Sequence, residues 1–342
     1  MGRKTRFFLL ACLVVALVPG TWLRTALPEP DFSPRLALQP LLLTQTMAGE
    51  ATIAGAWRLT SPNTHFGSYS ALVALPGGQL LAASDKGRFL QFAQPGGTGA
   101  TRFGWLAGND TTRKKLIDIE AMARDPESGR LWFAYEGTNT IERRNARFGE
   151  ARSVRPKPMA GFSSNSGPEA FTRLADGRFV VIAEGVPDWA GNRHPAFLFD
   201  DDPVESEAGF AFFFDPPTGY SPVDMVQIPD GRVLILVRRV AWGIPPTFPV
   251  KIVVADPADI AEDKVWSGTE VAQIVDPLPS DNFEGLAVVP QRDGTLSLWL
   301  ISDDNGSALQ RSLLLELIWD PRGPQAKEKA RSQAARRDLS GD

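Results

Sequence analysis

The sequence predicts an all-β fold, a single β-propeller with five blades favoured, and three observations lead to this prediction. A strand–turn–strand pattern recurs at a nearly constant interval, each copy carries hairpin-forming residues at its turn, and weaker strand-like runs follow most copies. Four short antiparallel strands in each repeat of about fifty residues are typical of a propeller blade. The repetition supports the fold more strongly than any one strand does.

The repeating unit is clearest between residues 282 and 305. Glu284 begins an apolar run, Asp293-Gly294 provides a turn, and a second apolar run ends at the pair Asp303-Asp304. Four other stretches have the same form, at residues 70–85, 118–136, 168–184 and 223–238. The five units begin at Ser70, Glu120, Glu169, Asp224 and Glu284. These starting positions are separated by 50, 49, 55 and 60 residues.

The turns and the weaker runs complete the blades. Asp-Gly and related glycine-containing turns favour two-stranded hairpins. These turns lie at residues 76–78, 126–129, 176–177, 230–231 and 293–294. The further strand-like runs are Thr140–Arg144, Ala196–Asp200, Gly209–Phe214, Pro249–Ala255, Glu270–Val275 and Leu313–Trp319.

The last unit is one strand short, and an N-terminal segment is the candidate for the missing strand. Gly55–Leu59 has strand character and would close the ring, which removes the free edges that an open sheet exposes. A six-bladed ring stays an alternative, since a degenerate unit would fit into the long intervals after Asp224. The predicted propeller spans residues 51–320.

The N-terminal segment has the pattern of a secretory signal. Arg3, Lys4 and Arg6 precede an apolar run over residues 7–18, which is short for a membrane span. We interpret residues 1–27 as a signal peptide and expect a periplasmic or secreted protein. No clean cleavage site follows, so the alternative is an uncleaved signal anchor in the inner membrane, which would be the only membrane contact.

The other segments are simpler. The single cysteine, Cys12, lies within the signal segment, so disulfides and thiolate metal sites are excluded from the exported domain. Residues 28–50 are rich in Pro and Leu and are interpreted as a linker. Residues 321–342 are polar without apolar periodicity and are interpreted as a disordered tail.

The charge of the central part argues against nucleic acid. Residues 28–321 contain 26 Lys and Arg against 37 Asp and Glu, a net charge of −11, which the whole-chain value of −4 hides. Nucleic-acid binding needs a basic face. An acidic body agrees better with cation binding, and we expect a monomer that binds a small molecule, with a phosphorylated one as first candidate.

Propeller geometry places the acidic residues together. The first strand of each blade lines the channel and the second returns beside it, so unit starts and unit ends meet on one face, and the hairpins lie on the other. One channel mouth should therefore be surrounded by acidic residues, which are Asp85, Glu120, Glu136, Glu169, Glu184, Asp224, Glu284 and Asp303. The fourth unit ends instead on the basic residues Arg238 and Arg239, which interrupt this acidic ring. The predicted catalytic residues are Glu120, Glu169, Arg238 and Arg239.

Hard cations such as Ca²⁺ prefer six to eight oxygen ligands from carboxylates, amides and carbonyls. The predicted metal ligands with this chemistry are Asp118, Asn282, Glu284, Asp303 and Asp304. The competing interpretation is structural: an acidic residue repeated at strand starts often accepts backbone N–H groups of the neighbouring blade.

Loops on the same face offer groups for an anionic or phosphorylated substrate through charge-assisted hydrogen bonds. The predicted substrate-binding residues are Arg113, Lys114, Trp189, Arg193, His194 and Trp242. The alternative is an ordinary solvated loop with Trp as a packing residue. Nucleophile-elbow, P-loop, dinucleotide and His-Glu-x-x-His motifs do not occur, and the chain has only two histidines.

The motifs together resemble the phytase-like domain family, also described as having esterase-like activity of phytase. The resemblance spans about residues 67–319 and is carried by Asp118-Ile119-Glu120-Ala121-Met122, Pro168-Glu169-Ala170-Phe171, Pro229-Asp230-Gly231-Arg232 and Asn282-Phe283-Glu284-Gly285-Leu286. It implies an exported bacterial β-propeller named by analogy to alkaline phytases, which are calcium-dependent phosphomonoesterases. The chain lacks the dense acidic calcium-and-phosphate motifs of true phytases. The resemblance therefore supports the fold more strongly than it supports the activity.

Two function hypotheses follow from these features. The first is a calcium-dependent hydrolase of phosphate or carboxylic esters that uses the acidic mouth, with Arg238 and Arg239 stabilising developing negative charge. The second is a non-catalytic propeller that binds a ligand or protein in the cell envelope, motivated by the lack of an identifiable nucleophile-and-base pair.

Overall fold

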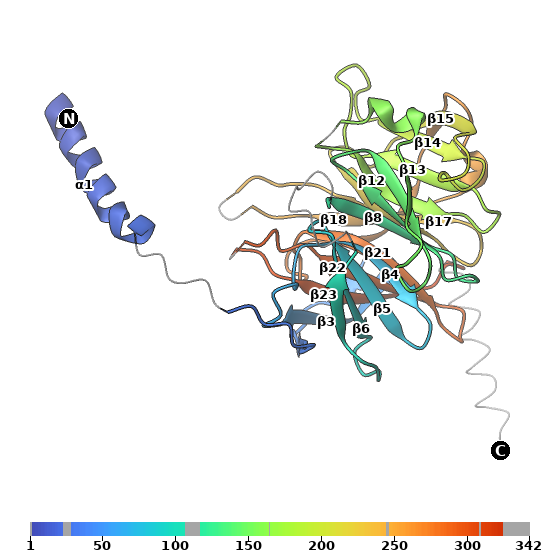
Figure 1. Cartoon of the computed structure of the whole chain (residues 1–342), viewed down its shortest axis with the longest axis horizontal. Coiled ribbons are helices and arrows are strands. Elements are labelled where there is room, and N and C mark those ends of the chain that lie inside the picture. The colour runs from blue at the N-terminus through green and yellow to red at the C-terminus, as the bar shows by residue number, and fades with distance from the viewer. Residues whose placement is uncertain are drawn as a thin grey trace.

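Five β-sheets are arranged in a ring around a common channel (Figure 1). The computed structural model describes residues 2–22, 29–106, 117–163, 165–243, 246–307 and 309–323. One strand of each sheet lines the channel, and each of these inner strands contacts the next around the ring. The inner strands are β4 (Tyr69–Leu75), β8 (Ile119–Arg124), β12 (Pro168–Arg173), β16 (Ser221–Gln227) and β21 (Phe283–Pro290).

Each inner strand begins an antiparallel blade. The first blade continues with β5 (Gln79–Ser84), β6 (Arg88–Ala93) and β7 (Arg102–Trp105), and the second with β9 (Leu131–Tyr135), β10 (Thr140–Arg144) and β11 (Arg152–Val154). The third continues with β13 (Phe179–Ala183), β14 (His194–Phe199) and β15 (Gly209–Phe214), to which β19 (Val265–Trp266) adds in parallel. The fourth continues with β17 (Val233–Arg238), β18 (Val250–Ala255) and β20 (Thr269–Ile274).

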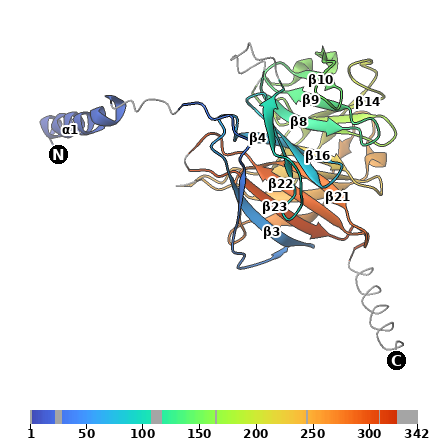
Figure 2. The same ribbon diagram turned by 60° about the horizontal axis from the view of Figure 1, so that its bottom comes forward.

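The fifth blade joins the two ends of the domain, as the sequence predicted. It consists of β21, β22 (Leu296–Ser302), β23 (Leu313–Trp319) and the N-terminal β3 (Ala51–Thr60), with β1 (Ala37–Pro40) and β2 (Met47–Ala48) pairing with β3. In the register of β23 and β3, Leu315 lies opposite Ala56. Figure 2 shows the blue N-terminal strand beside the red C-terminal strands. Five blades are therefore confirmed.

Every inner strand carries a β-bulge at the same place, near the start of the strand. The residue left out of the register is Ser70, Glu120, Glu169, Val223 or Glu284. A bulge adds one unpaired residue and redirects its side chain. The repeat read from the sequence was therefore one residue out of step in the fourth unit, where Val223 and not Asp224 is the bulge residue.

The position after each bulge lies where inner strands approach closely. It holds Ala71, Ala121, Ala170, Asp224 or Gly285. A Cβ added to Gly285 would lie 2.9 Å from the backbone carbon of Ala71 and 2.7 Å from Cγ2 of Ile301. Small residues are needed here because β4 and β21 pack almost backbone to backbone, and Asp224 is the exception.

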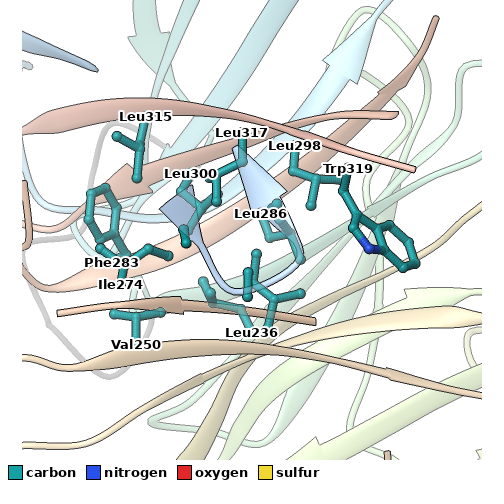
Figure 3. Packing of buried hydrophobic residues seen from close by; sticks show 14 of the residues in the cluster. Leu236, Val250, Ile274, Phe283, Leu286, Leu298, Leu300, Leu315, Leu317 and Trp319 are labelled. Carbon is teal, nitrogen blue, oxygen red and sulfur yellow. The ribbon is translucent and has the colours of Figure 1, made fainter. Parts of the chain in front are cut away.

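The hydrophobic core lies between neighbouring sheets. Figure 3 shows one such cluster, in which Leu236 and Val250 of the fourth blade face Leu286, Leu300 and Leu315 of the fifth. The middle strands are buried on both faces: all seven residues of β22 and all five of β13 are buried. Continuous apolar runs are typical of strands covered on both sides.

The hairpins lie at the opposite ends of the inner strands from the bulges. Gly177, Gly231 and Gly294 have φ of 98°, 94° and 85° in these turns, a region that favours glycine. The remaining elements are α1 (Arg3–Trp22) and the 3₁₀ turns η2 (Lys157–Gly161) and η3 (Pro257–Asp259). Within the described residues, no helix has the length and apolar character needed to cross a membrane.

Candidate functional site

Three of the bulge residues, Glu120, Glu169 and Glu284, bring carboxylates from β8, β12 and β21 to one mouth of the channel. The pKa of Glu120 is raised well above its usual range, first by burial and then by the negative charges of Glu169 and Glu284. Burial, followed by Glu184 and Glu284, also raises the pKa of Glu169. Three of the predicted unit starts therefore lie close together, because mutual effects of this kind need short distances, whereas Asp224 does not join them.

One half of the mouth is organised by Arg238, at the end of β17. Its Nη1 donates to Oε1 of Glu284 at 2.5 Å and to Oδ1 of Asn282, and its Nη2 lies 3.2 Å from Oε1 of Glu184. Asn282 in turn donates to Glu284 at 2.8 Å. Burial lowers the pKa of Arg238, but Glu284, Glu184 and Glu169 outweigh it and hold that pKa above its ordinary value.

The other half consists of carboxylates. Asp118, Glu120 and Glu136 each offer an oxygen atom, and these three atoms lie within 4.8 Å of one another. Asp118 precedes β8 and Glu136 follows β9, and the backbone N–H of Glu136 donates to the carbonyl of Asp118 at 2.9 Å. This hydrogen bond holds the start of one strand beside the end of the next. Asp118 and Glu136 are buried, at 3% and 9% exposure.

The carboxylate half fits a hard divalent cation. Three anionic oxygen donors in one buried cluster match the ligand chemistry of Ca²⁺, and Glu169 and Glu284 add negative charge nearby. Carboxylates this close raise one another's pKa unless a positive charge compensates them. Arg238 supplies that compensation only on the opposite half, where it is bound to Glu284 and Glu184.

Of the predicted metal ligands, Asp118 alone belongs to this cluster. Glu284 and Asn282 are bound to Arg238. Asp304 accepts backbone N–H groups from Ser68 and Gly306 and a hydroxyl from Ser312. That residue fastens the loop after β22 to the first blade.

Asp303 is buried at 4% exposure, and its Oδ1 accepts the N–H of Asn305 at 2.7 Å. Burial, together with the charge of Glu284, raises its pKa to about 8.

The carboxylate cluster of Asp118 and Glu120 also includes Glu136, which was absent from the predicted ligand set. The signal for it is present in the sequence, because the second unit ends at Tyr135-Glu136.

Asp224 has the structural role that was considered for the repeated acidic residues. It is 1% exposed, and its carboxylate accepts N–H groups from Leu286 at 2.6 Å and from Met225 at 2.8 Å. Its displacement by one position from the bulge explains this role, since the side chain then lies among the inner strands. Burial raises its pKa, and the amide hydrogen bonds oppose that shift.

The predicted substrate-binding residues are spread over several environments. Trp189 and Trp242 are 76% and 91% exposed, and Arg193 is also exposed. His194 is buried at 1% exposure, with Nδ1 at 3.0 Å from the carbonyl of Ala183. Arg113 and Lys114 lie outside the described residues.

Arg239, predicted to act beside Arg238, is directed elsewhere. Its guanidinium lies 5.3 Å from the ring centre of Tyr220, and its backbone N–H donates to Pro249. Consecutive strand residues project to opposite faces of a sheet, which separates the two arginine side chains. Arg238 alone is therefore part of the mouth.

Comparison with known proteins gives a family and several distant structures. The model of the family described as "Phytase-like: Esterase-like activity of phytase" matches residues 64–306. No curated protein shows significant sequence similarity to the chain.

The structure is similar to an endo-arabinase from Bacteroides thetaiotaomicron, with 10% identity over 75% of this chain and 96% of the other and a TM-score of 0.48. It is also similar to the PQQ-bound aldose sugar dehydrogenase of Streptomyces coelicolor, with 13% identity over 84% and 100% of the two chains and a TM-score of 0.42. A luciferin-regenerating enzyme matches at 10% identity over 83% and 95%, with a TM-score of 0.43. Because the family model covers most of the chain, including the inner strands that carry the acidic mouth, the protein belongs to the phytase-like family.

Proposed function

We propose that the protein is a cation-dependent hydrolase of phosphate or carboxylic esters, with the acidic mouth as its active site. The observation that carries this proposal is the cluster of Asp118, Glu120 and Glu136, whose oxygen atoms lie within 4.8 Å of one another beside Glu169 and Arg238. The family description agrees with ester hydrolysis.

The residues of the mouth divide into distinct roles. Asp118, Glu120 and Glu136 would hold the cation, and Ca²⁺ is the first candidate because all three donors are carboxylate oxygens. A bound divalent cation supplies Lewis-acid polarisation of an ester or phosphoryl oxygen.

Glu169 is the candidate general acid–base. It is buried, and its pKa is raised first by burial and then by Glu184 and Glu284, which favours the protonated carboxyl group that a general acid needs. Arg238 is a positioning residue, because its N–H groups are already bound to Glu284, Asn282 and Glu184. It fixes the glutamates and offsets part of their charge.

The test is hydrolysis of nitrophenyl phosphate and nitrophenyl acetate by the purified chain, with added Ca²⁺ and with chelator. We expect turnover of at least one ester, loss of that turnover with chelator, and its loss in Glu120→Gln and Glu169→Gln. Glu262→Gln, at an exposed position in the loop after η3, is the matched control. No turnover of either ester under any cation condition, in a chain that is folded and binds the cation, would favour the binding-propeller hypothesis.

We further propose that the protein is exported. The basic residues and the apolar run of the first 18 positions support export, and fractionation of cells that produce the full chain tests it. Recovery in the cytoplasm would overturn this part without affecting the hydrolase proposal.

A further inference from the structure

A cavity lies at the hairpin side of the ring, away from the acidic mouth. It has a volume of about 370 Å³, and all five inner strands β4, β8, β12, β16 and β21 contribute to its lining. Small-molecule sites in proteins typically enclose ~300–1,000 Å³. The cavity is thus the hairpin-side end of the central channel and has the size of a ligand site.

Asp224 marks the inner end of this cavity. Its carboxylate binds the backbone N–H groups of Leu286 and Met225, and these two residues also line the cavity. Along β16, Val223 is at the bulge level, Asp224 follows it, and Met225 is the first lining residue. The cavity and the acidic mouth are therefore separate sites on one axis.

The walls of the cavity are mainly apolar. Met122 and Met225 line it together with the half-buried side chains of Val73, Val226 and Val288. Methionine is flexible and polarisable, which lets a pocket adapt to an alkyl chain. Such a lining favours a ligand with an apolar body.

The charged residues of the lining, among the described part of the chain, are two arginines. Arg173 donates to the carbonyl of Leu174 at 3.3 Å and lies 3.8 Å from Asp125. Arg124, at the end of β8, makes no hydrogen bond or ion pair with any described residue, although it is half-buried. Burial lowers the pKa of Arg124, and the charge of Asp125 opposes that effect.

Asp125 is the acidic neighbour of both arginines, and its carboxylate is held within its own turn. It accepts the N–H groups of Glu127 and Ser128 as well as the hydroxyl of Ser128. Asp125 therefore makes no hydrogen bond with Arg124, which lines the cavity beside the turn at residues 126–129. A half-buried guanidinium without a bound partner gains most from an anionic oxygen group.

We propose that this cavity binds an amphipathic carboxylate, with its alkyl chain among the apolar walls of the channel and its carboxylate on Arg124. The experiment is calorimetric titration of the full chain with decanoate, decylamine and acetate. Decanoate is expected to bind, and decylamine and acetate to bind at least about tenfold more weakly, since decylamine carries the opposite charge and acetate lacks the apolar body. Arg124→Gln should weaken decanoate binding by about tenfold.

The control variant is Arg178→Gln, because Arg178 is a hairpin arginine bound to Asp176 and does not line the cavity. It should leave decanoate binding unchanged. Equal affinity for decanoate and decylamine, an unchanged affinity in Arg124→Gln, or no binding at millimolar decanoate would each overturn the proposal. Chelator should not alter the affinity, which keeps this result independent of the acidic mouth.

Methyl NMR of the unmodified chain locates the ligand without any substitution. Decanoate should shift the methyl signals of Met122 and Met225, and Met159, buried in η2 between the second and third blades, should not move. Shifts at Met159 without shifts at Met122 and Met225 would place the ligand elsewhere and contradict the assignment.

Discussion

The carboxylate of Asp224 accepts the backbone N–H of Leu286 at 2.6 Å, which joins the inner strands of the fourth and fifth blades. The same carboxylate accepts the N–H of Met225. This is the one position after a bulge where a charged residue takes the place of a small one. The arrangement gives a buried acidic residue a structural role beside a mouth whose other acids are candidates for chemistry.

Asp224→Ala should therefore destabilise the domain. Two buried N–H groups would lose their acceptor, at a cost of about 3 kcal/mol in the free energy of unfolding. Asp224→Asn retains one acceptor oxygen and should cost less. Urea unfolding measures both, and Asp230→Ala in an exposed hairpin is the control, with an expected change of about 0.5 kcal/mol or less. Equal stability of Asp224→Ala and the parent would contradict the assigned role.

Gly285→Ala tests the close approach of the inner strands. The new Cβ would lie 2.9 Å from the backbone of Ala71, so the two strands would have to separate. We expect a loss of about 1–3 kcal/mol in the free energy of unfolding, as for other overpacked sites. Gly161→Ala is the matched control, because no atom lies within 4 Å of its added Cβ. A fully stable Gly285→Ala variant would show that the ring relaxes more easily than this packing implies.

Removing the charge of Arg238 should be strongly destabilising. In Arg238→Met, Glu284 and Glu184 lose their ion-pair partner inside the mouth, and loss of one partner from a buried pair costs about 3–5 kcal/mol. Thermal unfolding at low and neutral pH measures this. The loss should be smaller at low pH, where the glutamates are protonated. A loss that does not depend on pH would indicate a packing effect instead.

Cation binding should stabilise the folded chain through the cluster of Asp118, Glu120 and Glu136. At a Ca²⁺ concentration one hundred times Kd, the gain is about 2.7 kcal/mol. Glu120→Gln should remove most of this gain, because it replaces one of three clustered donors. Melting curves with Ca²⁺, Mg²⁺ and chelator provide the measurement, and Glu262→Gln should respond as the parent does. An unchanged response to Ca²⁺ in Glu120→Gln would move the cation away from this cluster.

Protonation of His194 should oppose folding in mild acid. Burial lowers the pKa of this ring below its ordinary value of 6.5, against the opposing effect of its hydrogen bond to Ala183. Between that lowered pKa and 6.5, the unfolded chain binds a proton that the folded chain does not. The contribution of His194 to the free energy of unfolding therefore decreases as the pH falls through this window, by at most about 1.4 kcal/mol per pH unit, while the buried carboxyl groups with raised pKa contribute in the opposite direction.

Urea midpoints between pH 5 and pH 8 measure this slope. His194→Asn keeps a donor for the carbonyl of Ala183 but cannot be protonated, so the loss of stability that His194 causes toward low pH should be absent from its slope. His65→Gln should reduce the slope less, because His65 is only partly buried. An identical slope in His194→Asn and the parent would rule out His194 as its source.

Much of the fold could be predicted from the sequence because it is repeated. The strands Thr140–Arg144, Gly209–Phe214 and Leu313–Trp319 were predicted with the bounds that the structure has. Closure by Gly55–Leu59 was also predicted, and the observed strand β3 is longer, Ala51–Thr60. Local turn chemistry and apolar runs are properties of short segments, and five copies make each segment easier to recognise.

The candidate site could be predicted only in outline. The gathering of Glu120, Glu169 and Glu284 at one mouth follows from the topology. The assignment of Glu284 and Asn282 to a cation did not anticipate that Arg238, 46 positions before Glu284, binds both. Partners of this kind are set by the rotation between blades, which no local pattern encodes.

The sequence by itself determined the repeat, the closed ring and the acidic character of one channel mouth. These features depend on the period of apolar residues and on turn residues, which act over a few positions. The tertiary structure decided the division of the mouth into an arginine half and a carboxylate half, the burial of Asp224, and the apolar cavity below it. These depend on a one-residue difference in a bulge and on contacts between strands that lie far apart in the chain, so they exist only once the five blades are packed together.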